Sequence, residues 1–278
     1  MNDYIALMKP RLMPLLNLAS VSAAITASKS INLQVIVPLL IAGCLGCGGA
    51  SALNCYLEKS IDEKMPRTKS RPVPSERIPG NTALFFGLSL LIASLAISYI
   101  FINLSVAFYI LLGAFFYVVI YTKWLKQKSS LNIVIGGFAG SCASLAGWAS
   151  VQPPGIFAWL IALFVFLWTP SHFWPLAIKI KDDYSKAGIP MLPSIVSHKK
   201  ACYFIIINTL LLIASSVLVY LYGGLSIIFL APAMLFGAIF VFFNIQLFND
   251  EKKAFKNFMF SILYLSVLLI TMAADSLL

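Results

Sequence analysis

The chain is short of charge. Only 11% of its 278 residues are Asp, Glu, Lys or Arg, whereas 60% are hydrophobic. A soluble domain of this size does not need so much apolar surface, so the composition excludes an ordinary soluble protein. Roughly 20 apolar residues cross a bilayer as a helix, and the lipid interior admits only helices or closed barrels. The hydrophobic runs are continuous rather than alternating, which favours helices.

Metal-binding side chains are also scarce, with two His and five Cys in the whole sequence. Cys44 and Cys47 form a CxxC pair, but no second pair and no neighbouring His completes a zinc site. The pair lies in a run of small residues, where close helix packing is the favoured interpretation. Redox or metal chemistry at this pair is the less favoured alternative.

The hydrophobic runs predict an all-α fold, a polytopic membrane bundle of nine transmembrane helices in a single integral-membrane domain, residues 1–278. The predicted spans are at about 12–28, 33–54, 81–101, 104–122, 132–150, 156–176, 201–222, 225–247 and 257–275.

The few charges are distributed on one side. Every Lys and Arg except Lys29 lies in the N-terminal segment or in alternate gaps between spans, and so does every acidic residue except Asp275. By the positive-inside rule, the N-terminus and these loops are cytoplasmic and the C-terminus lies outside. The rule explains the net charge of +10 better than nucleic-acid binding does. The first residues lack a signal-peptide pattern, which favours a prokaryotic plasma membrane.

The first charged loop carries a row of oxygen ligands. Asn54, Glu58 and Asp62 are four residues apart, so on a helix they share one face. Two carboxylates and an amide suit a hard cation such as Mg²⁺, which takes further ligands from substrate phosphates. Arg67 and Arg71 could then hold those phosphates directly. The alternative is a solvated loop with ordinary ion pairs.

A second charged loop repeats this chemistry. Asp182 and Asp183 offer two further carboxylates, while Lys179 and Lys181 offer cations for phosphate. Carboxylates on two loops could hold Mg²⁺ ions across one diphosphate and draw off charge as an allylic C–O bond breaks. The predicted catalytic and metal-binding residues are Asn54, Glu58, Asp62, Asp182 and Asp183.

The two loops carry a family resemblance. The run from Asn54 to Pro72 resembles the NxxxDxxxDxxMxRTxxRP signature of the protohaem IX farnesyltransferases (haem O synthases), which belong to the UbiA-type intramembrane prenyltransferase superfamily. The PSHFW sequence at 170–174 and KDDYSKAGIPMLP at 181–193 are similar to the second motif of that family, and the likeness extends over residues 4–200. Glu58 departs from the family pattern, which usually has Asp there.

The resemblance implies a Mg²⁺-dependent transfer of farnesyl from farnesyl diphosphate to a vinyl group of protohaem IX (haem B), which is substrate rather than cofactor, releasing diphosphate and giving haem O. Membrane lipid surrounds the site, and a terminal oxidase assembly or haem-modifying enzyme is the implied partner. Tyr121, Lys126 and Asn132 lie in segments that match the family and are expected near the diphosphate or the allylic cation. His172 could ligate or orient haem iron, or be a buried hydrogen-bonded histidine.

Two other functions compete. One is a prenyltransferase of the same superfamily acting on an aromatic, quinone-precursor or lipid acceptor, against which the PSHFW and AGIPMLP sequences favour haem. The other is a transporter of an anionic substrate, which would use the basic loops to attract it. The near absence of ionisable residues at the predicted mid-depth of the spans weighs against transport.

Overall fold

The computed structural model describes residues 3–278, so residues 1 and 2 of the predicted domain lie outside the described residues. All regular elements in this part of the chain are helices. The long ones are α2 (Met13–Ser28), α3 (Leu33–Leu57), α5 (Gly80–Phe101), α6 (Leu104–Phe115), α8 (Phe138–Ala149), α9 (Ile156–Lys179), α12 (His198–Gly223), α13 (Ile227–Asn249) and α14 (Ala254–Asp275). The short ones are α1 (Asp3–Met8), η1 (Pro10–Leu12), α4 (Lys59–Asp62), η2 (Phe116–Leu125), α7 (Asn132–Gly136), α10 (Lys181–Lys186), α11 (Leu192–Ile195) and η3 (Glu251–Lys253).

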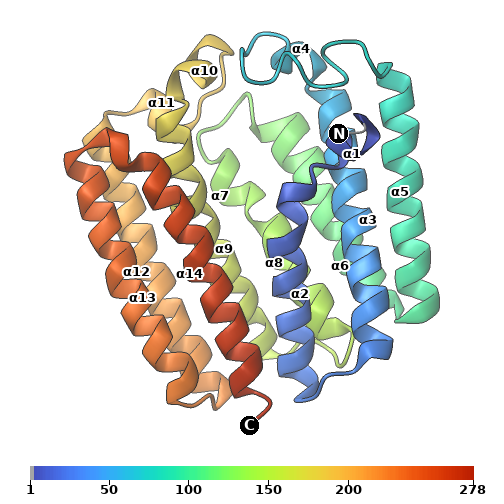
Figure 1. Ribbon diagram of the computed structural model, residues 1–278, viewed down its shortest axis with the longest axis vertical. Helices are drawn as coiled ribbons and strands as arrows, with labels where there is room; N and C mark the ends of the chain where they lie inside the picture. Colours follow the sequence, from blue (N-terminus) through green and yellow to red (C-terminus); the bar gives the residue numbers. More distant parts are fainter. Residues whose placement is uncertain (1–2) are drawn as a thin grey trace.

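The long helices form a closed circle. Each packs against the next in the order α2, α3, α5, α6, α8, α9, α12, α13 and α14, and α14 returns to α2. Contacts of α2 with α8 and of α9 with α14 cross the interior. In Figure 1, helices α2, α3, α5 and α6 form one side of the bundle, and α12, α13 and α14 form the other. The predicted all-α membrane bundle is confirmed.

Eight helical segments of the described chain are long and apolar enough to cross a membrane. The remaining predicted span, the first at 12–28, corresponds to α2, which has 16 residues and lies among the other helices of the circle. The predicted limits agree with the observed helices to within about three residues. The fourth span continues from α6 into η2, and the fifth is divided between α7 and α8.

Small residues bring the helices together. A Cβ atom on Gly147 would lie 1.9 Å from the carbonyl oxygen of Ser20, so α2 and α8 pack backbone to backbone there. Large apolar side chains point outward instead, for example Phe85 and Ile92 on α5, which are 68% and 65% exposed. This distribution suits a bundle surrounded by lipid, whose interior is filled by close packing.

The charged loops gather at one end of the bundle. Figure 1 places the N-terminus, α1, α4, α10 and α11 at this end, and the C-terminus at the other. Ile61 and Met65 of the first loop pack in one buried cluster with Tyr184, Ile189 and Met191 of the second. The two loops predicted to act together are therefore joined by an apolar contact.

Candidate active site

The first row of oxygen ligands is assembled at the charged end. Asn54 lies in the last turn of α3, Glu58 ends that helix, and Asp62 lies at the end of α4. The backbone N–H of Glu58 donates to Asn54 O at 3.0 Å, and that of Asp62 donates to Glu58 O at 2.8 Å. The three side chains thus keep to one side although the helix breaks between α3 and α4. All three are no more than 2% exposed.

Each of these side chains has a cationic partner. The Lys9 ammonium donates to Asn54 Oδ1, and Lys126 forms an ion pair with Glu58. Arg71 Nη1 donates to Asp62 Oδ2 at 2.7 Å. Buried carboxylates without partners would be costly, and these cations compensate the burial of Glu58 and Asp62.

Lys9 reaches the site through an unusual backbone turn. Its φ of 51° and ψ of 60° are left-handed, a region that non-glycine residues rarely adopt. The residue sits between α1 and η1, where the following Pro10 starts a new helical turn. Local strain of this kind persists where surrounding contacts hold it, and here the held side chain is the partner of Asn54.

A wide helical turn brings Lys126 and Thr122 to the row. Residues of η2 form a π-helix, in which the Lys126 N–H donates to Tyr121 O at 2.8 Å. The Thr122 hydroxyl donates to Tyr117 O at 2.8 Å and accepts from Asn54 Nδ2 at 2.9 Å. Turns of this type often occur at functional sites because they shift the direction of the side chains that follow.

Burial and a neighbouring carboxylate shift the pKa values of Lys126 and Arg71 in opposite directions. Burial lowers the pKa of Lys126 below its ordinary value, and the charge of Glu58 only partly offsets it. Burial also acts to lower the pKa of Arg71, but the charge and hydrogen bond of Asp62 raise it overall. Arg71 is thus a permanent cation, whereas Lys126 depends on its carboxylate partner to keep its charge.

The site has two oxygen atoms without hydrogen-bond partners that suit a hard cation. Asp62 Oδ1 and Asn132 Oδ1 are buried without a hydrogen-bond partner among the described residues. Asn132 begins α7, and its Nδ2 donates to Lys126 O at 3.3 Å, so it belongs to the same site. Oxygen ligands with free lone pairs beside a basic residue fit Mg²⁺ together with a phosphate.

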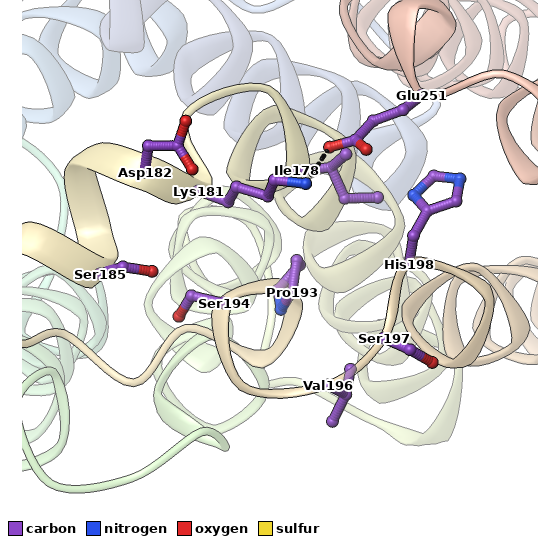
Figure 2. Close-up of a pocket in the computed structure, with 10 residues that line it drawn as sticks. All are labelled: Ile178, Lys181, Asp182, Ser185, Pro193, Ser194, Val196, Ser197, His198 and Glu251. Carbon is purple, nitrogen blue, oxygen red and sulfur yellow. Dashed lines mark ion pairs between the residues drawn. The ribbon is translucent and has the colours of Figure 1, made fainter.

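The carboxylates of the second loop, Asp182 and Asp183, do not form a common metal site with Asn54, Glu58 and Asp62 in this structure. Within the described residues, no three His, Cys, Asp or Glu side chains come together as a metal site. Lys181 pairs with Glu251 at 2.7 Å, and Lys179 lies over the Phe255 ring at 3.8 Å. Figure 2 shows Asp182 with this ion pair around a pocket of about 340 Å³. Asp183 is half-buried, and a shared metal site of the two loops stays a prediction.

Arg67 links the loops through its charge. The residue is exposed, and among the described residues it forms no ion pair. Burial raises the pKa of Tyr184 to about 12, and the charge of Arg67 opposes this rise. Arg67 therefore lies near the second loop with its guanidinium available, as a phosphate-binding group would.

The remaining predicted residues, Tyr121 and His172, make aromatic contacts. Tyr121 stacks on Tyr117 with ring centroids 5.9 Å apart, and Lys126 lies 5.6 Å from the Tyr121 ring. His172 lies on α9 between two aromatic rings, with Nδ1 hydrogen-bonded to Ser261 Oγ at 2.7 Å. Tyr121 is therefore beside the acid row, whereas His172 faces the C-terminal helices.

Several contributing residues were not predicted, among them Lys9, Thr122 and Ser261. The direction of the Lys9 side chain depends on a left-handed backbone turn, which the sequence does not indicate. Thr122 depends on the π-helix, which has no sequence signature. Ser261 lies in α14, where the sequence predicts only a hydrophobic helix.

A closed bundle of membrane helices with a buried row of acids at its charged end is the architecture of an intramembrane prenyltransferase. The UbiA prenyltransferase family model matches residues 15–268. The chain belongs to this family.

Named relatives agree with this assignment. The chain is 38% identical to protoheme IX farnesyltransferase 1 of Cenarchaeum symbiosum, over 99% of this chain and 95% of that protein. It is 40% identical to protoheme IX farnesyltransferase of Roseiflexus castenholzii, over 99% of this chain, and spans about half (52%) of that longer relative. A UbiA homolog from Archaeoglobus fulgidus bound to DMAPP and Mg²⁺ shares the fold, with a TM-score of 0.70 at 14% identity, over 98% of this chain and 99% of that one.

Proposed function

We propose that this prenyltransferase moves a farnesyl group from farnesyl diphosphate to a vinyl group of haem B, giving haem O and diphosphate. The observation that carries the proposal is the buried row Asn54, Glu58 and Asp62, with a cation at each member. The names of relatives at 38–40% identity support haem as the acceptor. The protein lies in the cell membrane, with the charged end of the bundle and the N-terminus on the cytoplasmic side and the C-terminus on the outside.

The acid row would hold Mg²⁺ through Asn54, Glu58 and Asp62. When bound, Mg²⁺ withdraws negative charge from the diphosphate as the allylic C–O bond breaks. Arg71 and Lys126, which pair with the carboxylates in this structure, provide N–H donors for phosphate oxygens. Asp182 and Asp183 would complete the metal site from the second loop, with Lys179, Lys181 and Arg67 as further phosphate ligands.

The interior of the bundle would stabilise the allylic cation and keep water away from it. Tyr117 and Tyr121 present stacked rings below Lys126, and aromatic faces stabilise a cation. The apolar walls hold the isoprenoid chain and exclude water until the vinyl carbon has attacked. Water then adds to the resulting haem-side cation and loses a proton to solvent, so the product carries both a farnesyl and a hydroxyl group. His172 would contact the haem iron from α9.

Turnover in membranes tests this proposal. Haem B, farnesyl diphosphate and Mg²⁺ should yield a farnesylated haem, separated by chromatography. The product should disappear with EDTA. Asp62→Asn should lower turnover by about 100-fold or more, since it removes one charge from the metal site and the partner of Arg71. Release of diphosphate with a different acceptor, and not with haem, would retain the metal site but reject the substrate.

A further inference from the structure

His172 is held between two aromatic side chains. Its ring centroid lies 4.1 Å from Trp168 at an interplanar angle of 16°, and 4.5 Å from Phe258 at 28°. Two near-parallel rings at these distances cannot occupy the same face, so they cover opposite faces of the imidazole. Only the edge of the ring, which carries the two nitrogen atoms, remains for polar contacts.

Ser261 determines which nitrogen carries the proton. Its hydroxyl lies 2.6 Å from the carbonyl oxygen of Phe258, which can only accept a hydrogen bond. The single hydroxyl hydrogen is therefore used there. At the 2.7 Å contact between Ser261 Oγ and His172 Nδ1, the oxygen must accept and the histidine must donate. The imidazole is thus the Nδ1–H tautomer, and Nε2 carries a lone pair.

Nε2 is left available. Among the described residues, this atom has no hydrogen-bond partner, and the His172 side chain remains partly exposed although it lies within the bundle. Metal-binding histidines typically donate their other ring N–H to an oxygen atom, which fixes both tautomer and ring direction. The contact with Ser261 has this form.

The same serine fixes the ring on which His172 stacks. The indole Nε1 of Trp168 donates to the Ser261 carbonyl at 2.8 Å, so one residue of α14 orients two side chains of α9. One turn earlier on α14, Asn257 donates to Asn244 of α13 at 2.7 Å. Asn244 donates to Thr209 of α12 at 2.9 Å. These buried bonds hold α14 in position along its neighbours.

We propose that Ser261 is a positioning residue that fixes His172 as the Nδ1–H tautomer, so that Nε2 binds the iron of the haem substrate. The inference rests on the proposed function, because it takes haem B as the acceptor. It adds that the C-terminal helix α14, which carries no charged motif, controls how the acceptor is held. The iron ligand then sets the direction of the porphyrin ring, and with it the position of the vinyl group.

Haem titration of the purified full chain tests the inference. Wild-type protein in detergent should bind haem B with the Soret band of a histidine-ligated haem, and His172→Ala should lose this band position. Ser261→Ala should weaken binding by about 10- to 100-fold and alter the band, because the preferred tautomer is no longer fixed. Ser261→Thr keeps the hydroxyl and should restore the wild-type spectrum.

Ser215→Ala is the matched control. Ser215 is also a buried helix serine that donates to the carbonyl three residues earlier, at 2.6 Å to Leu212 O, but it contacts no histidine. Its removal should leave haem affinity and spectrum unchanged. A wild-type spectrum and affinity in Ser261→Ala, or equal losses in Ser215→Ala, would overturn the inference while the proposed function stands. A wild-type protein that binds no haem but prenylates another acceptor would overturn both.

Discussion

Glu58 and Lys126 form an ion pair whose side chains are 2% and 10% exposed. Removing one member of such a pair leaves an uncompensated buried charge, which typically costs about 3–5 kcal/mol. We therefore expect Lys126→Met to lower the thermal midpoint strongly. The double variant Glu58→Gln/Lys126→Met should recover most of the stability but none of the turnover. A single variant as stable as wild type, in a thermal melt of detergent-solubilised protein, would contradict the buried pairing.

Tyr184 predicts a local response to alkaline pH. Its folded pKa of about 12 lies above the value of about 10 of an unfolded tyrosine, so the folded state keeps its proton longer. Its contribution to stability is complete below pH 10 and is lost as pH rises toward 12. Tyr184→Phe should reduce the loss of stability over this interval by about 2 kcal/mol. An unchanged loss of stability between pH 10 and 12 in Tyr184→Phe would contradict this expectation.

At the residue scale, the sequence was informative where chemistry is local. The spacing of Asn54, Glu58 and Asp62 was sufficient to predict their common side, because backbone bonds four residues apart enforce it. The directions of Lys179 and Lys181 were not predictable, since their partners Phe255 and Glu251 come from α14 and η3, much later in the chain. Long flexible cations take whichever partner the tertiary structure offers.

At the scale of elements, η2 and α7 pack closely at Gly136, where the Tyr121 ring lies against the glycine. A Cβ atom on Gly136 would lie 2.8 Å from Cδ2 of Tyr121, so the tyrosine ring would have to move. Gly136→Ala should therefore cost about 1–3 kcal/mol and lower turnover, because Tyr121 lies beside Lys126. Gly140→Ala is the control, since its Cβ would meet only ordinary contacts, the nearest at 3.6 Å. Equal effects of the two variants in melts and assays would contradict this packing.

The limits of the helices were predictable because apolar runs are punctuated by charge, glycine and proline. The π-helix of η2 was not, since Phe116–Leu125 reads as the end of an ordinary span. The same holds for the role of α14. Its sequence shows a hydrophobic helix, and only the packing against α9 places Ser261 beside His172.

For the whole molecule, the distribution of charge predicts the orientation. The N-terminus and the charged loops lie at one end and the C-terminus at the other, as an odd number of crossings requires. We expect alkaline phosphatase fused after Leu278 to be active and green fluorescent protein fused there to be dark, since only the former matures outside the cytoplasm. The reverse pattern would show that the positive-inside rule fails here.

The closed circle of helices also explains why the site lies at one end. Acids, cations and the apolar contact between the first and second loops are all located where the helices meet the charged face. The apolar interior lies directly below. A charged diphosphate can then stay at the surface while its isoprenoid chain and the cation formed from it enter a water-poor space.

The most direct test of the proposed reaction is the mass of the haem product formed in ¹⁸O-labelled water. Membranes containing the protein would be given haem B, farnesyl diphosphate and Mg²⁺, and the extracted haems analysed by mass spectrometry. The account predicts a haem heavier by one farnesyl group and one hydroxyl, with the hydroxyl oxygen labelled. An unchanged haem, or a farnesylated haem without the label, would contradict transfer to the vinyl group through a cation that water captures.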